Sequence, residues 1–125
     1  MTQALTLDDN QAKYQIRAFE PGRIQINDII FTQNLIITPT QLITDWQPTH
    51  VFALKKEDFD IFITLRPDIL LVGVGSKLIF PPTEQYGHLI NAGIGIEFMN
   101  TAAACRTYNA LSSENRNVAA ALILL

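Results

Sequence analysis

Continuous apolar runs and one amphipathic segment dominate the second half of the chain. Residues 69–72 and 118–125 contain only apolar side chains, a pattern typical of strands that are covered on both faces. Residues 95–98 predict a third strand. Between the last two strands, small and apolar positions recur on one side at helical spacing. The pattern predicts a helix from Thr101 to Ser113, capped at its start by Asn100 or Thr101.

A second helix is predicted from Thr83 to Asn91, where Tyr86, Leu89 and Ile90 share one face. The chain thus runs strand, helix, strand, helix, strand. Connections of this kind are right-handed and join parallel strands. We therefore predict an α/β fold whose core sheet contains parallel strands at about 69–72, 95–98 and 118–125.

The first half of the chain is predicted to be rich in antiparallel strands. Residues 16–20 and 23–26 flank Pro21-Gly22, a turn pair that predicts a hairpin. Residues 29–31 and 35–38 flank a short polar stretch and predict a second hairpin. These strands either extend the core sheet or form a layer over it.

The segment between the two halves is less regular. A further strand is considered at 51–54, and residues 77–80 are considered as a short extension after the run 69–72. Residues 55–65 match both helical and strand spacing. We favour a short helix that begins near Glu57-Asp58, because carboxylates suit a helix N-terminus, and that ends before Pro67.

Composition limits the class of protein. The 125 residues correspond to one domain, with a loose polar tail at 1–13 and a single α/β domain at 14–125. The net charge is −3 and Lys and Arg do not cluster, so nucleic acid is not an expected partner. No apolar run approaches the roughly 20 residues of a membrane span. With one cysteine, Cys105, and a polar start, the sequence predicts a cytoplasmic protein without an internal disulfide.

Residues 100–111, Glu114 and residues 116–122 resemble the small domain family that contains the mitochondrial complex I assembly factor 3 and uncharacterised bacterial and archaeal proteins. The strand and glycine turn at 70–75 is also similar, except that Val74 stands where the family usually has Thr, which removes a hydroxyl from the turn. The resemblance covers about residue 16 to the end. It implies a three-layer fold with a mixed central sheet and no established enzymatic activity.

A ligand site is predicted at the carboxyl ends of two parallel strands. Gly73, Gly75 and Ser76 follow one strand, and Asn100 and Thr101 follow another. Loops at the carboxyl ends of parallel strands meet at one rim of the sheet, where α/β proteins commonly bind ligands. The start of the following helix offers N–H groups to an anion, and Lys77 adds charge. The alternative is that the glycines only shape a tight turn; no dinucleotide motif is present.

The remaining polar candidates have no catalytic spacing. Four residues in and after the helix form a polar cluster that is either a partner surface or a local structural network: Arg106, Asn109, Glu114 and Arg116. Cys105 is expected to be a packed thiol rather than a nucleophile. Two histidines, His50 and His88, give no metal-ligand spacing, and pairing of His88 with Glu84 is expected. We predict no catalytic residues, no metal and no cofactor.

Two functional hypotheses follow. The first is a non-catalytic binding or assembly-type module, as the resemblance implies, with a protein partner. The second is a small-molecule protein or enzyme that uses the rim formed by 73–77 and 99–101 for an anion or carboxylate. A homo-oligomer formed through edge strands is a further possibility, because the chain carries a very apolar final segment.

Overall fold

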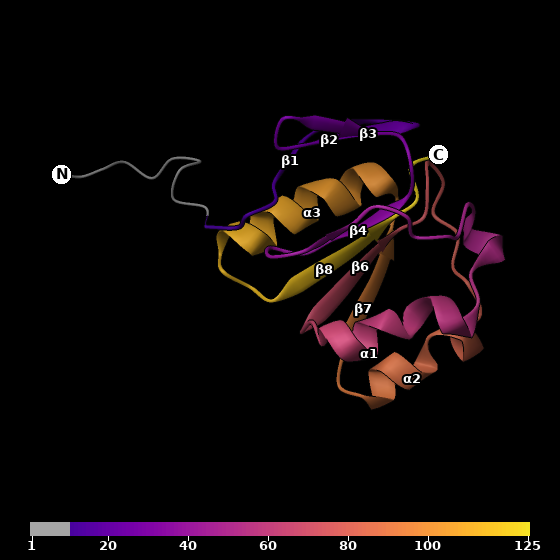
Figure 1. Ribbon diagram of the computed structural model, residues 1–125. Helices are drawn as coiled ribbons and strands as arrows, with labels where there is room; N and C mark the ends of the chain where they lie inside the picture. Colours follow the sequence, from indigo (N-terminus) through magenta and orange to yellow (C-terminus); the bar gives the residue numbers. More distant parts are fainter. Residues whose placement is uncertain (1–10) are drawn as a thin grey trace.

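The computed structural model describes residues 11–125 and is built around a five-stranded mixed sheet (Figure 1). Its strand order is β5 (Leu42–Ile43), β4 (Leu35–Ile37), β8 (Val118–Leu122), β6 (Ile69–Gly73) and β7 (Gly95–Met99). β6 runs parallel to both β7 and β8, whereas β4 is antiparallel to β5 and β8. The predicted α/β class and its three parallel core strands are confirmed.

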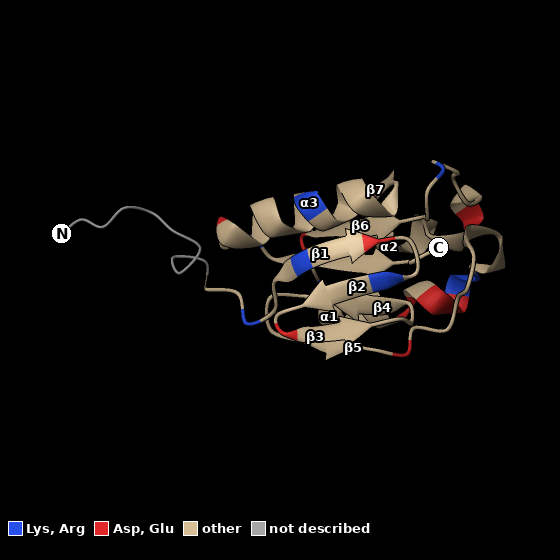
Figure 2. Ribbon diagram, turned by 90° about the horizontal axis from the view of Figure 1, so that it is seen from above, with Lys and Arg blue, Asp and Glu red and all other residues tan. Residues whose placement is uncertain are grey.

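The N-terminal strands form a separate antiparallel sheet over this central one. Within the described residues it contains β1 (Ile16–Glu20), β2 (Arg23–Ile26) and β3 (Ile29–Phe31). Helix α3 (Thr101–Ser113) lies beside β1, so that α3 and the small sheet together cover one face of the central sheet (Figures 1 and 2). The expectation that the hairpins form a layer over the core sheet is thus confirmed for β1–β3.

The opposite face of the central sheet is covered by short helices. These are α1 (Ile61–Leu65), α2 (Gly87–Asn91) and the 3₁₀ helices η2 (Val51–Ala53), η3 (Lys56–Phe59) and η4 (Thr83–Gln85). The arrangement has three layers, as the family resemblance implied. No helix within residues 11–125 combines the length and the apolar character that crossing a membrane requires.

Alternating side chains divide the core into two clusters, one on each face of the central sheet. In β8 and the residues after it, the even positions from Val118 to Leu124 pack toward α3 and the small sheet, and Ala119, Ala121 and Ile123 pack toward the short helices. The three central residues of β8 are alanines and all are fully buried. Small side chains at the centre of the sheet leave room for Tyr108 on one face and Phe59 and Phe62 on the other.

Two side chains of α3 fasten the small sheet to the rest of the molecule. The Asn109 amide accepts a hydrogen bond from the Ile16 N–H (3.1 Å) and donates one to the Ile16 carbonyl (2.7 Å). The Tyr108 hydroxyl donates to the Tyr14 carbonyl (2.8 Å). β1 is an edge strand, and the Asn109 amide takes the place that a neighbouring strand would occupy there.

The predicted hairpin between residues 29–31 and 35–38 is wrong. β3 pairs with β2 in the small sheet, whereas β4 enters the central sheet between β5 and β8. All three residues of β4 are buried, and such a strand needs cover on both faces. Asn34 stabilises the crossing between the sheets, because its side chain accepts from the Leu124 N–H (2.7 Å) and donates to the Pro48 carbonyl (2.5 Å).

Four other local predictions also need correction. Residues 51–53 form a 3₁₀ helix instead of a strand, because the His50 ring nitrogen accepts the Phe52 N–H (3.1 Å) as a cap. The helix predicted at 83–91 is interrupted at Tyr86, whose φ of −131° is not helical. Residues 77–80 form no strand. The last strand ends at Leu122, after which the backbone bonds to Gly22, Asn34 and Gly73 instead of to one neighbour.

Other boundaries agree with the sequence. Asn100 caps α3 by accepting the Ala103 N–H (2.8 Å). The region near Glu57-Asp58 is helical, as η3 followed by α1, and ends at Arg66 before Pro67. The two-residue strand β5 was not predicted. The tail predicted at 1–13 lies largely outside the described residues. Its last residue, Lys13, donates its N–H to the Pro39 carbonyl (2.7 Å).

The packing of β8 predicts that replacing one of its alanines with a larger side chain destabilises the protein. Ala120→Leu places three extra carbons against buried Tyr108 and Leu71, so we expect a loss of about 1–3 kcal/mol in the free energy of unfolding. Urea denaturation followed by circular dichroism measures it. Ala110→Leu on the exposed side of α3 is the matched control, with a change within about 0.5 kcal/mol. An equally stable Ala120→Leu protein would contradict this account of the core.

Candidate functional site

Thr101 joins three segments at the carboxyl ends of the parallel strands. Its hydroxyl accepts the Gly75 N–H (2.9 Å) and donates to the Ile123 carbonyl (2.5 Å). Its own N–H donates to the Gly75 carbonyl (2.9 Å). Thr101 is fully buried, so its hydroxyl is satisfied inside the protein and holds the loop after β6 against the segment after β8.

The two glycines of the turn are required by this close contact. A Cβ at Gly73 would lie 3.0 Å from both Cα and Oγ1 of Thr101 and 3.1 Å from Leu122. Gly75 has φ of +102°, which favours glycine. Residues 73 and 75 therefore bring the α3 N-terminus against the end of β6.

The start of α3 uses most of its free N–H groups within the protein. The Thr101 N–H donates to the Gly75 carbonyl and the Ala103 N–H donates to the Asn100 side chain, whereas the Ala104 N–H makes the first bond of the helix itself, to the Asn100 carbonyl. Only the Ala102 N–H of the first four lacks a protein acceptor among the described residues. An anion at this point would therefore gain one backbone donor from the helix instead of a cluster of them.

A hollow of about 380 Å³ lies directly above this junction. Three of the five predicted rim residues, Gly75, Ser76 and Asn100, line it, whereas Gly73 and Thr101 are buried beneath. The rest of its wall comes from the end of β1 and the turn after it, from α3 and from the last residue: Phe19, Glu20, Pro21, Ala102 and Leu125. We call it the rim hollow. Lys77 is not part of its lining.

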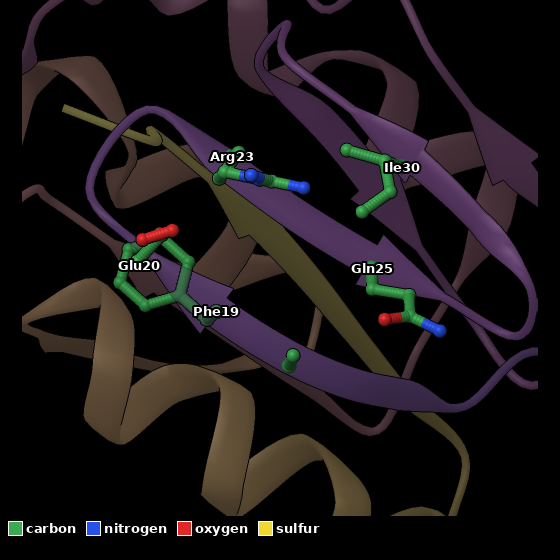
Figure 3. A pocket seen from close by; sticks show the side chains of 6 residues that line it. Phe19, Glu20, Arg23, Gln25 and Ile30 are labelled. Atoms are coloured by element: carbon green, nitrogen blue, oxygen red, sulfur yellow. The ribbon is translucent and has the colours of Figure 1, made fainter.

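Two further hollows adjoin the rim hollow through shared residues. One, of about 400 Å³, lies on the outer face of the small sheet and is lined by Ala18, Phe19, Glu20, Arg23, Gln25 and Ile30 (Figure 3). The other, of about 210 Å³, lies between β1 and α3 and is called the β1–α3 groove. Phe19 lines all three hollows. We call the three together the Phe19 surface.

A bulge in β1 gives this surface its shape. Ile16 pairs with Ile26, but Ala18 pairs with Gln25, so β1 carries one extra residue at Arg17. The extra residue shifts the alternation of side chains by one position, so that Phe19 packs partly against the core while Ala18 is exposed. Arg17 is exposed at the bulge and lines the β1–α3 groove.

The four residues of the predicted polar cluster are not brought together. Arg106 is exposed and lines the β1–α3 groove, and Asn109 bonds to Ile16 in its wall. Glu114 is the cap residue that follows α3, and Arg116 lines a different hollow with Leu65 and Pro67. The cluster thus divides between two places, and two of its members belong to the Phe19 surface.

Cys105 and His88 are not arranged as an activated nucleophile and its base. Cys105 is buried, and desolvation raises the pKa of its thiol to about 12 despite the opposing charge of Arg106, so the thiol is protonated at neutral pH. His88 Nε2 lies 3.2 Å from an Asp60 carboxylate oxygen, which corrects the expected pairing with Glu84. Among residues 11–125 no three His, Cys, Asp or Glu side chains gather in a way that could hold a metal ion.

Sequence reasoning missed the residues that the N-terminal sheet contributes. Phe19 reaches the rim hollow, and Arg17 and Arg23 reach the hollows next to it, because the turn of the small sheet docks at the end of β8, where the Gly22 N–H donates to the Leu124 carbonyl (2.6 Å). Pro21-Gly22 indicated the turn, but no local pattern indicated where that turn docks.

Thr101→Val tests the junction beneath the rim hollow. The change keeps the shape but leaves the Gly75 N–H and the Ile123 carbonyl without a partner in a buried site, so we expect a loss of about 2–4 kcal/mol in the free energy of unfolding. Chemical denaturation measures it. Thr107→Val, half-buried in the same helix, is the matched control. Equal stability of the two variants would show that the hydroxyl bridge contributes nothing.

Comparison with known proteins shows which family and which relatives this chain resembles. A family model described as "Protein of unknown function (DUF498/DUF598)" matches residues 16–123. The "13 kDa major membrane protein" of Francisella tularensis subsp. holarctica (strain LVS) is 33% identical over 115 residues, which cover 90% of this chain and 93% of that protein. The "NADH dehydrogenase [ubiquinone] 1 alpha subcomplex assembly factor 3" of Danio rerio is 32% identical, over 86% of this chain and 63% of that protein.

Comparison with solved structures agrees with the family match. A solution structure of a Bordetella pertussis protein described as a Mth938-like domain superposes with a TM-score of 0.78 and 25% identity, covering 99% of this chain and 90% of that one. The resemblance predicted from residues 100–122 is confirmed. The chain spans a little under two thirds of the length of the zebrafish assembly factor that it matches.

Proposed function

Because the chain belongs to the DUF498/DUF598 family, whose relatives include proteins named as assembly factors, we propose that it is a non-catalytic, assembly-type module that binds a protein partner. The Phe19 surface is the proposed contact. The observation that carries the proposal is that three hollows share one half-buried aromatic side chain.

The shape of the Phe19 surface suits a protein segment better than a single small molecule. Each hollow is at or below the lower part of the range for small-molecule pockets, which starts near 300 Å³. Because neighbouring hollows share wall residues, an extended segment would contact all of them. Its apolar centre around Phe19 and its charged edge at Arg17, Arg23 and Arg106 resemble the anatomy of protein interfaces.

The proposal includes a cytoplasmic location, as the composition predicts. The name of the Francisella relative, a major membrane protein, provides the alternative, in which a partner holds the module at a membrane. Fractionation of native cells, before and after a high-salt wash, separates the two.

Site-specific photo-crosslinking in native cells tests the proposed contact. A photoreactive phenylalanine analogue at Ala18, which is exposed in two of the hollows, is expected to trap one partner in stoichiometric amounts. The same analogue at Ile90, exposed on the short helix α2 that covers the opposite face of the central sheet, is the matched control and should trap little.

Three results of this experiment are informative. One defined partner at position 18 alone supports the proposal. Equal capture at both positions, or none at either, contradicts a contact at the Phe19 surface. Capture of a second copy of this chain would show that the Phe19 surface forms a homo-oligomer instead of binding an assembly partner. The apolar final segment is compatible with that outcome.

A second candidate function is the binding of a small anion or carboxylate in the rim hollow. The observation that favours it is the position of Gly75, Ser76 and Asn100, which line a hollow of about 380 Å³. The side chains of Ser76 and Asn100 are exposed there, so they can donate hydrogen bonds to an oxygen of the ligand. The Ala102 N–H adds one backbone donor.

A thermal-shift panel of small carboxylates and phosphates tests this candidate. A ligand at one hundred times its Kd should stabilise the protein by about 2.7 kcal/mol. Ser76→Glu introduces a like charge into the rim hollow and should abolish the shift, whereas Ser113→Glu, exposed at the far end of α3, should not. A panel without any shift would eliminate the small-molecule function for the compounds tested.

A further inference from the structure

Two arginines line the β1–α3 groove and no carboxylate does. Arg17 enters from the bulge of β1, and Arg106 enters from α3. The other lining residues are apolar or neutral: Ile16, Ala18, Phe19, Ala102, Cys105 and Asn109. A groove with this composition attracts negative charge.

Neither arginine is neutralised within the part of the chain that the structure describes. Both side chains are exposed, and no carboxylate of residues 11–125 forms an ion pair with either. Arg106 also acts on the groove wall, since its charge lowers the pKa of the buried Cys105 thiol against the larger effect of burial. The guanidinium groups thus remain available to an external carboxylate.

The neighbouring strand provides a contrast. Arg23 lies directly across the hairpin from Glu20, so its charge has a carboxylate nearby. Arg17 sits at the extra position of the bulge and has no cross-strand partner in the register. The whole protein carries a net charge of −3, so two unpaired arginines on one groove concentrate positive charge where the chain as a whole is acidic.

The surface beyond the arginines has an apolar wall, and its polar lining residues are Glu20, Ser76 and Asn100. The β1–α3 groove shares Phe19 and Ala102 with the rim hollow, where Pro21 and Leu125 continue the apolar wall. Leu125 leaves 60% of its surface exposed. A ligand that reaches from the arginines into the rim hollow would therefore place an apolar group beside its acidic groups.

We propose that the Phe19 surface binds an acidic segment of a partner protein, with Asp or Glu carboxylates on Arg17 and Arg106 and an adjacent apolar side chain in the rim hollow. The inference rests on the proposed protein-binding function and specifies the chemistry of the partner. Arginine suits this role because its planar group binds a carboxylate through two parallel hydrogen bonds. A free small carboxylate would use the arginines but leave the apolar wall uncovered.

NMR titration of the ¹⁵N-labelled full chain tests the proposal. The probe is an N-acetylated, C-amidated pentapeptide with the one-letter sequence DELDE. We expect chemical shift changes at backbone amides of residues 16–19 and 102–109, and binding that weakens at least tenfold between about 0.05 and about 0.5 M NaCl because salt screens exposed charges. The pentapeptides NQLNQ and KRLKR should bind at least tenfold more weakly than DELDE.

Variants of the chain locate the contact. The double substitution Arg17→Gln and Arg106→Gln should weaken binding of DELDE at least tenfold and leave the melting temperature unchanged, because both side chains are exposed. Arg116→Gln removes another exposed arginine, one that lines a different hollow, and this variant should bind DELDE as the wild type does.

Each other outcome overturns the proposal in a different way. Equal binding of NQLNQ would show an apolar contact without charge recognition. Equal binding of citrate would assign the arginines to a small anion. No binding of DELDE, or shifts elsewhere on the molecule, would contradict the acidic segment. In that last case, specific crosslinking at position 18 would still support a protein partner of other chemistry, so the two proposals fail separately.

Discussion

The hydroxyl group of Thr101 is the interaction on which the rim of this protein depends. A buried hydroxyl needs both a donor and an acceptor role to offset its removal from water. Here it accepts from Gly75 and donates to Ile123, so one side chain ties the α3 N-terminus to the loop after β6 and to the segment after β8. The two residues that follow Ile123 meet the rest of the rim, because the Leu124 carbonyl accepts the Gly22 N–H of the N-terminal turn and Leu125 lines the rim hollow.

The same junction explains why a turn rich in glycine is not by itself a binding motif here. Gly73 is needed because Thr101 approaches to 3.0 Å of where its Cβ would be, and Gly75 because its φ is positive. The α3 N-terminus satisfies three of its four first N–H groups within the protein. What the fold offers at this rim is a hollow above a filled junction, and its walls are supplied by residues from both ends of the described chain.

The N-terminal sheet turns that hollow into a larger surface. Its edge strand β1 is fastened by Tyr108 and by the amide of Asn109, which occupies one part of the strand edge. The bulge at Arg17 lets Phe19 pack partly against the core and turns a charge outward. The position of Phe19 and the outward charge of Arg17 thus arise from one irregularity in one short strand, whereas Arg23 and Arg106 are contributed by β2 and α3.

The sequence alone determined the features that depend on local pattern. Unbroken apolar runs identified β6 and β8, helical spacing and Asn100 identified α3, and the family resemblance implied the three layers. It misplaced β4, because a run of three residues shows its partner only when its burial on both faces is known. It also could not show that Tyr86 interrupts a helix or that His50 caps one, since these are decided by backbone angles and single hydrogen bonds.

The residues of the candidate site also fall into two groups, those that the sequence predicted and those that only the structure brought together. Gly75, Ser76 and Asn100 were found from sequence because loops that follow parallel strands must meet at one rim. Phe19, Arg17 and Leu125 come from segments about a hundred residues apart in the chain, and no periodicity links them. Only tertiary packing decided that these residues share a surface, because contacts between distant segments depend on how whole layers stack and not on the spacing of neighbours along the chain.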